Sequence, residues 1–151
     1  MRPTTLWRTL LLVVALLPFS SCTDDDFDMN DDAFYNLTSV TWFDEYYGVL
    51  PDRREFSESN YWDFYADGTG VWDHYYQEEG YDAQQQRYYF DWDFTPEDFG
   101  IIHLYIPGVG DEFWMIDELT PYRFSSYVSE YDPNYVADPP YTYQRLKALI
   151  E

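Results

Sequence analysis

Few side chains in this sequence could perform catalysis, and none of them lies in a recognisable motif. Proton transfer needs groups held within hydrogen-bonding distance of one another, and histidine is the side chain that most often serves. The sequence contains two histidines, His74 and His103, which fall in separate expected strands with no motif around either. Pairs of carboxylates such as Asp91 with Asp93 are frequent, but a chain with 29 acidic residues produces them by chance. The sequence therefore predicts no enzyme, no cofactor and no metal site; a deep pocket joining a histidine to a buried carboxylate would favour an enzyme instead.

Cys22 is the one cysteine of the chain, and its surroundings indicate chemistry of another kind. Residues 1–8 are short and basic, residues 10–17 form an unbroken apolar run, and two serines precede the cysteine. This order is typical of a secretory signal. The apolar run is shorter than the roughly 20 residues that a helix needs to span a bilayer. We therefore expect residues 1–21 to be a signal peptide that is removed from the chain.

The boundary at Cys22 resembles a bacterial lipobox, in which the cysteine becomes the lipid-modified first residue of the mature protein. Phe19 stands where that motif usually has leucine. The three aspartates after Thr23 resemble the signal that sends Bacteroidetes-type lipoproteins to the outer face of the outer membrane. The resemblance implies lipid attachment at Cys22 and a cell-surface location in the outer membrane.

Residues 22–35 are expected to form an acidic, flexible tether. Six of the ten residues from Thr23 to Asp32 are aspartates, and repulsion between like charges keeps such a segment extended. Removal of residues 1–21 takes Arg2 and Arg8 away and changes the formal charge from −21 to −23. Nucleic acids and anionic lipid headgroups are bound by clustered Lys and Arg. We therefore expect no nucleic-acid partner, and contact with the membrane through the lipid anchor alone.

The rest of the chain, residues 36–151, predicts one all-β domain. The sequence is 46% hydrophobic and 23% aromatic, which supplies a packed core despite the high charge. Aromatic residues alternate with acidic ones towards the end of the segment 88–94, as is typical of a half-buried strand. Gly68 and Gly70 are expected to supply the positive φ of a tight hairpin. Eight strands are expected, at 37–47, 61–65, 71–76, 88–94, 101–106, 112–118, 122–129 and 141–146.

Consecutive antiparallel strands with short connections favour a single up-and-down antiparallel β-barrel of about eight strands. No segment of ten or more residues shows a convincing helical period, although 52–59 or 83–87 could form a short helical turn. Loops of such a barrel alternate between its two ends. The connections expected on one rim include the three longest of the chain, so a ligand is expected at that rim. These connections are 48–60, 77–86, 107–111 and 130–140.

The expected strands also carry features that resemble the lipocalin-like domains of Bacteroidetes-type lipoproteins. Val40 stands where that family often has glycine. The resemblance covers roughly residues 36–146 and implies a lipocalin-like barrel. It rests on Leu37 leading to Trp42, on the segment 64–70, and on Phe90-x-Trp92, Trp114-x-Ile116 and Leu119-Thr120.

Large aromatic side chains are expected to fill most of the barrel, because a lumen of eight strands holds either its own side chains or one small ligand. An open cavity is the alternative. The residues expected to point inward are Trp42, Trp62, Phe64, Trp72, Phe90, Trp92, Trp114 and Ile116. The candidate ligand-binding residues are the tryptophans of this set and three tyrosines of the long loops: Trp42, Trp62, Trp72, Trp92, Trp114, Tyr81, Tyr131 and Tyr135.

Taken together, these features predict a surface-exposed, non-enzymatic lipoprotein that binds a small hydrophobic molecule or a glycan. The tyrosine-rich rim offers rigid, amphipathic contact area for such a ligand. The same rim would suit the alternative, a structural or protein-interaction lipoprotein with a filled barrel, no small-molecule ligand and a place in a surface complex.

Overall fold

The computed structural model of the chain describes residues 29–95 and 98–150. The predicted signal peptide, the predicted lipid attachment site Cys22 and the first part of the predicted tether lie outside the described residues. Among the residues that are described, no helix is long and apolar enough to cross a membrane.

Eight antiparallel strands form one closed barrel in the order of the sequence, which confirms the predicted fold class. Each strand pairs with its neighbours in the chain, and β1 pairs with β8 to close the barrel. The strands are β1 (Trp42–Val49), β2 (Glu55–Phe64), β3 (Thr69–Glu78), β4 (Gln84–Thr95), β5 (Asp98–Ile106), β6 (Gly110–Leu119), β7 (Arg123–Ser129) and β8 (Thr142–Ala148).

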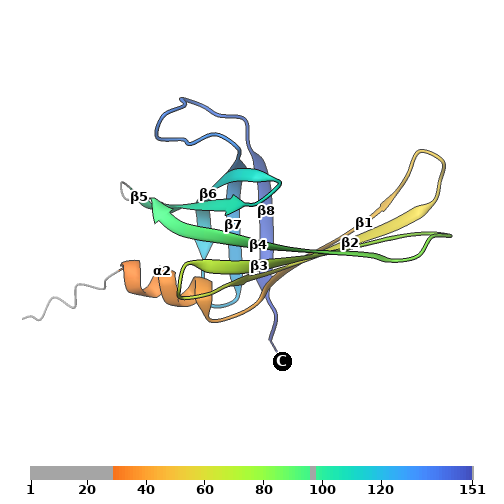
Figure 1. Cartoon of the computed structure of the whole chain (residues 1–151), viewed down its shortest axis with the longest axis horizontal. Helices are drawn as coiled ribbons and strands as arrows, with labels where there is room; N and C mark the ends of the chain where they lie inside the picture. Colours follow the sequence, from red (N-terminus) through yellow and green to blue (C-terminus); the bar gives the residue numbers. More distant parts are fainter. Residues whose placement is uncertain (1–28, 96–97, 151) are drawn as a thin grey trace, which may run out of the picture.

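The first four strands continue beyond the barrel as a four-stranded sheet, which we call the extension (residues 45–58 and 74–89). Figure 1 shows its two hairpins projecting to one side of the molecule. Among the described residues, β1 pairs with β8 only through Trp42 and Phe43, and β4 pairs with β5 only from Asp91 onward. Both edges of the extension are therefore open.

The extension corrects two expectations. The predicted helical turns at 52–59 and 83–87 are wrong, because β2 begins at Glu55 and β4 at Gln84. The ring of Phe56 lies 5.6 Å from that of Tyr46 and 5.8 Å from that of Tyr76, on the two neighbouring strands. Such cross-strand aromatic pairs stabilise extended structure. One rim of the barrel, which we call the mouth, carries the connections 50–54, 79–83, 107–109 and 130–141. The first three are shorter than expected, and 130–141 is the long loop of the mouth.

A helix, α2 (Met29–Thr38), occupies residues that were assigned to the tether and to the start of the first strand. Both assignments are wrong for these residues. Ala33 and Leu37 lie one helical turn apart and pack in the core, Leu37 with no exposed surface. Trp42 Nε1 donates a 2.9 Å hydrogen bond to the carbonyl oxygen of Leu37, and the Phe34 ring lies 5.8 Å from that of Trp92. The folded unit therefore begins at the helix.

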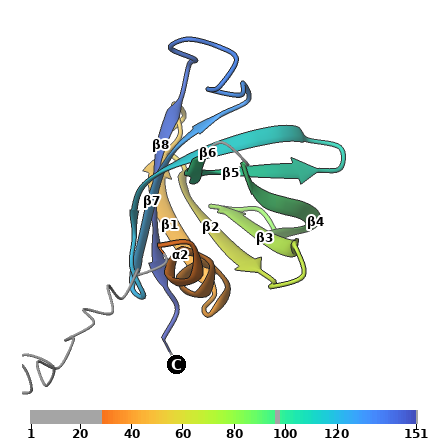
Figure 2. The same cartoon turned by 90° about the vertical axis from the view of Figure 1, so that its left-hand side faces the viewer.

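The helix lies at the end of the barrel opposite the mouth. It contacts β2 and β6, and Figures 1 and 2 show it on the side away from the hairpins of the extension. Because Leu37 is packed among barrel side chains, α2 covers that end and excludes water from it.

The core fills the half of the barrel next to α2. Two of the residues predicted to point inward, Trp72 and Ile116, are partly buried and pack against the core. The other six are buried, which confirms their inward positions: Trp42, Trp62, Phe64, Phe90, Trp92 and Trp114. Gly68 has the expected positive φ of 83°, but Gly70 does not. Gly70 instead makes room for Phe90, since a Cβ there would lie 2.2 Å from that ring.

Candidate functional site

A pocket of about 360 Å³ opens in the half of the barrel nearer the mouth, where β1 and β8 part. Strands on both sides of this gap supply its walls, so the barrel is filled at one end and hollow at the other. The lining residues are Asp44 on β1, Glu58, Asn60 and Trp62 on β2, Trp72 on β3, Glu112 and Trp114 on β6, Val128 on β7 and Thr142, Tyr143, Gln144 and Arg145 on β8.

Three indole rings form the boundary between this pocket and the core. Trp62 and Trp72 are opposite each other on β2 and β3 and stack with their ring centroids 4.6 Å apart. Tyr88 stacks on Trp72 at 4.7 Å, and Trp114 meets Trp62 edge to face at 4.8 Å. Both faces of Trp72 are therefore covered by protein rings. Trp72 thus contributes to a rigid apolar floor but offers a ligand no free face for stacking.

A chain of hydrogen bonds orders the polar wall above that floor. Trp72 Nε1 donates to Asn60 Oδ1 at 2.9 Å, and Asn60 Nδ2 donates to Glu58 Oε1 at 3.5 Å. The same carboxylate oxygen lies 3.3 Å from His74 Nε2. On the other side, Trp114 Nε1 donates to Glu112 Oε2 at 2.8 Å. Two indoles thus hold an amide and a carboxylate in place at the pocket.

Two buried polar atoms among the lining residues lack a hydrogen-bond partner: Asp44 Oδ1 and Trp62 Nε1. Trp62 is only 4% exposed, so its N–H has no access to bulk water. A buried donor or acceptor without a partner costs about 1–3 kcal/mol. Both atoms are covered by neighbouring protein atoms, so a molecule in the pocket can supply the missing donor and acceptor only after these side chains shift.

Burial raises the pKa of two carboxyl groups of the pocket above their ordinary values. Desolvation is the main cause for Asp44, and the nearby charge of Glu58 adds to it, while a hydrogen bond from Asn60 acts in the opposite direction. Desolvation is also the main cause for Glu112, against the hydrogen bond from Trp114. Perturbed carboxyl groups of this kind concentrate at functional sites.

The charge of the pocket is negative. Its lining includes the carboxylates of Asp44, Glu58 and Glu112. Arg145 is the one basic residue of the described lining, and its guanidinium lies over the Tyr143 ring, 5.2 Å from the ring centroid. Because the walls exclude part of the solvent, the field of these carboxylates is stronger there than in water.

A second hollow of about 480 Å³ adjoins the pocket on the side of the long loop. Glu112, Val128 and Thr142 line both spaces, and Tyr131 and Tyr141 add aromatic surface from the two ends of the loop. The two spaces together extend the site from the barrel interior to the loop 130–141.

Three of the predicted ligand-binding tryptophans, Trp62, Trp72 and Trp114, come together at the pocket. Trp42 and Trp92 do not line it. They lie in the core near α2, where Trp42 Nε1 donates to Leu37 and Trp92 Nε1 donates to the carbonyl oxygen of Thr69 at 2.9 Å. Their role in the described structure is to hold the closed end of the barrel together.

The three predicted tyrosines lie apart from one another. Tyr131 lines the adjoining hollow. Tyr135 is 82% exposed in the long loop. Tyr81 lies in the β3–β4 turn of the extension, with the guanidinium of Arg54 5.0 Å from its ring centroid. Only Tyr131 therefore belongs to the site.

The polar residues of the pocket were missed from the sequence, although a signal for them exists. Asp44 is two residues from Trp42, Asn60 two from Trp62, and Glu112 two from Trp114. Residues two apart on a strand point to the same face, so polar residues in phase with inward tryptophans must point into the barrel. An inward carboxylate is unusual, because a charge is costly to bury.

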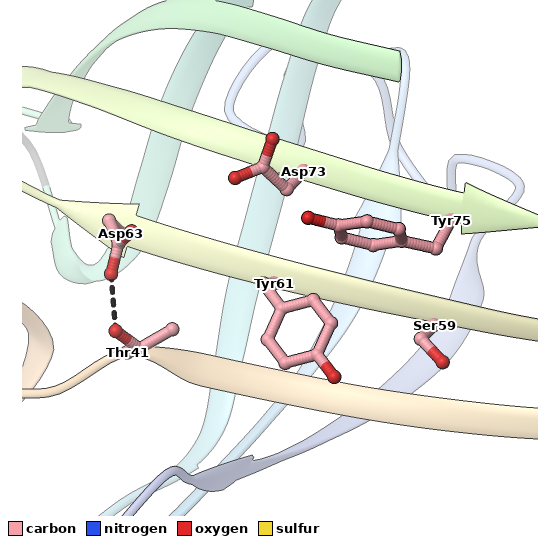
Figure 3. A pocket seen from close by; sticks show the side chains of 6 residues that line it. All are labelled: Thr41, Ser59, Tyr61, Asp63, Asp73 and Tyr75. Carbon is pink, nitrogen blue, oxygen red and sulfur yellow. Dashed lines mark hydrogen bonds between the residues drawn. The ribbon is translucent and has the colours of Figure 1, made fainter. Parts of the chain in front are cut away.

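Another groove, of about 510 Å³, lies on the outer face of β2 and β3. Figure 3 shows its lining, with Tyr61 and Tyr75 beside Asp63 and Asp73. Here the polar groups already have partners in the protein. Thr41 Oγ1 donates to Asp63 at 2.5 Å, and Arg87 donates two hydrogen bonds to Asp73 at 2.7 and 2.6 Å. The mouth pocket, with its unpartnered atoms, is therefore the better candidate despite its smaller volume.

Within the described ranges, no group of three or more His, Cys, Asp or Glu side chains is arranged to hold a metal ion. Comparison of the chain with models of protein families finds no match. Comparison with curated proteins finds none, and comparison with solved structures finds none either.

Proposed function

We propose that this protein is a lipid-anchored binding module of the outer-membrane surface, which holds a small polar molecule or the end of a glycan in the mouth pocket. The proposal depends on one observation: Asp44 Oδ1 and Trp62 Nε1 both lack a hydrogen-bond partner, and both residues line the same pocket. A hydroxyl group can donate a hydrogen bond to Asp44 Oδ1 and accept one from Trp62 Nε1, so a hydroxylated ligand can satisfy both atoms.

Of the two ligand classes that the sequence suggests, the pocket favours a glycan over an apolar molecule. Its walls carry three carboxylates and two amides, from Asn60 and Gln144. An apolar ligand would remove these groups from water without replacing their hydrogen bonds, at a cost for each group. A ligand with several hydroxyl groups avoids that cost.

Binding rather than catalysis is supported by the places of the two histidines. His74 faces Glu58, whose side chain is 37% exposed, and His74 is not part of the pocket lining. His103 lies on the outer surface, where it contacts Asp111 at 2.8 Å and stacks on Phe113. Neither histidine therefore joins a buried carboxylate in a deep pocket, the arrangement that would favour an enzyme.

The test of binding is a glycan array and native mass spectrometry on the mature lipoprotein in detergent. Tryptophan fluorescence follows any compound that binds, because three indoles border the pocket. We expect a bound species, and a fluorescence change that Trp62→Phe reduces. Absence of any bound species in both experiments would rule the binding function out.

Anchoring is tested separately, by metabolic labelling with a fatty acid in the native host. We expect label on the full chain and none on Cys22→Ala, and surface exposure to protease for the labelled protein. Label that survives the substitution would contradict attachment at Cys22.

The alternative, an accessory subunit of a surface complex, is favoured by the open edges of the extension. The backbone of β1 from Asp44 to Val49 has no strand on its β8 side among the described residues, and an open edge can accept a strand of another protein. Mild detergent extraction followed by pull-down would then recover a stoichiometric partner. Recovery of the protein alone would count against this role.

A further inference from the structure

We propose that the ligand of the mouth pocket carries a protonated primary amine on a hydroxylated ring, as a hexosamine with a free amino group does. This inference rests on the proposed binding function and specifies its ligand. It follows from the charge of the wall, from the atoms left without partners and from the covered faces of the indoles.

The carboxylates that would bind the amine come from three strands that are distant in sequence. Asp44 lies on β1, Glu58 on β2 and Glu112 on β6, and all three line the same pocket. Asp44 and Glu112 are partly removed from solvent, which penalises their charge. A cation bound beside either carboxylate offsets that penalty, because opposite charges attract strongly where water is excluded.

The existing hydrogen bonds leave capacity for such a cation. Glu58 already contacts His74 and Asn60, whereas Glu112 accepts one side-chain hydrogen bond among the described residues, from Trp114. Asp44 Oδ1 receives none. A primary ammonium group has three N–H donors and no acceptor. It is therefore complementary to Asp44, which has the unpartnered oxygen, and the charge of Glu112 in the same lining adds to the negative field, whereas a carboxylate or phosphate ligand would be repelled.

The Trp62 indole shows that the cation is not the whole ligand. Its Nε1–H is buried and has no acceptor, and an ammonium group cannot accept a hydrogen bond. A hydroxyl or ring oxygen on the same molecule can. The ligand thus needs an amine for Asp44 and an oxygen for Trp62.

The aromatic stack explains why the amine should dominate affinity. Neutral sugars are usually held by stacking on an open aromatic face, but Trp72 is covered on one side by Trp62 and on the other by Tyr88. Polar contacts must then supply most of the affinity, and hydrogen bonds to charged partners are the stronger ones.

Three sugars that differ at one position provide the test: glucosamine, glucose and N-acetylglucosamine, titrated calorimetrically into the mature lipoprotein at low ionic strength. Acetylation keeps the nitrogen and removes its charge. We expect glucosamine to bind at least tenfold more tightly than the other two sugars, and added salt to reduce this preference.

Matched variants locate the effect. Asp44→Asn and Glu112→Gln keep the side-chain shape and remove one charge each, and we expect either to reduce the preference for glucosamine severalfold. Glu45→Gln removes the same charge from the next residue of β1, which is exposed and faces outward. We expect it to leave the preference unchanged.

The outcomes separate this inference from the function on which it rests. Equal binding of glucosamine and glucose, or a preference that Glu45→Gln reduces as much as Asp44→Asn does, would overturn the amine assignment while binding itself stands. If none of the three sugars binds but the array identifies an uncharged glycan, the amine assignment is also overturned. If neither experiment finds any ligand, the binding function is overturned with it.

Discussion

The indole rings of Trp62 and Trp72 lie parallel across β2 and β3, with their centroids 4.6 Å apart and their planes 4° apart. Tyr88 on β4 extends this stack, so one row of rings crosses three strands at the level where the filled core ends and the pocket begins. The same contacts that stabilise the sheet thus form the floor of the candidate site.

Removal of the central ring of this stack is expected to destabilise the protein. Trp72→Ala leaves a cavity between Trp62 and Tyr88, and such truncations typically cost about 3–5 kcal/mol; since Trp72 is only partly buried, we expect the lower end, about 3 kcal/mol. Equilibrium unfolding in urea measures the change. Tyr47→Ala, at a side chain 71% exposed on β1, serves as control, with an expected change within about 0.5 kcal/mol. Equal effects would show that the stack contributes no stability.

The packing of α2 on the barrel is tested by Leu37→Ala. Leu37 has no exposed surface and lies in the core, and leucine-to-alanine changes at such sites cost about 2–5 kcal/mol. We expect a lower thermal midpoint and increased proteolysis near the helix. Tyr35→Ala, on the same helix but 68% exposed, should leave both unchanged. A Leu37→Ala protein as stable as wild type would mean that the helix does not seal the barrel.

The charges of Asp44 and Asp73 are expected to change the free energy of unfolding in opposite directions. The pKa of Asp44 is raised from 3.8, chiefly by desolvation, so its ionisation opposes folding above that raised value. We therefore expect Asp44→Asn to increase the free energy of unfolding at pH 7. The gain should shrink as pH falls through the raised pKa and disappear below 3.8, where the carboxyl is protonated in both states.

Asp73 provides the contrasting case on the outer face. The hydrogen bonds from Arg87 lower its pKa from 3.8, so its charge stabilises the folded state at neutral pH. Asp73→Asn should reduce stability at pH 7, and the loss should fade as pH falls from 3.8 through the lowered pKa. Urea unfolding of Asp44→Asn and Asp73→Asn, from pH 7 down through these pKa values, measures the sign of the change in the free energy of unfolding for each variant. Stabilisation by Asp73→Asn at pH 7 would contradict the assignment.

Hydrogen exchange should reveal the open edge of β1. The amides from Glu45 to Val49 that point away from β2 have no strand partner on the β8 side among the described residues. We expect them to exchange much faster than those of β3, which lies between β2 and β4. Equal protection in the two strands would mean that another chain covers this edge, as the accessory-subunit alternative requires.

Much of the barrel could be predicted from the sequence because strand patterning is local. Aromatic and apolar residues at every second position set which side chains face inward, and six of the eight predicted inward residues are buried. The same alternation carries Asp44, Asn60 and Glu112 to the inner face in phase with Trp42, Trp62 and Trp114. The number of strands and the face of each residue are thus properties of the sequence itself.

The helix, the extension and the pocket depended on the tertiary structure. Residues 29–38 carry too few apolar side chains to indicate a helix, and α2 is stabilised by the contact of Leu37 with the barrel. The pocket exists because β1 and β8 separate after two residue pairs, which leaves a space that Asp44 and Glu112 reach from strands far apart in sequence. Where strands part, and which polar residues then meet, is decided by closure of the whole sheet, since no local pattern encodes a distance between β1 and β6.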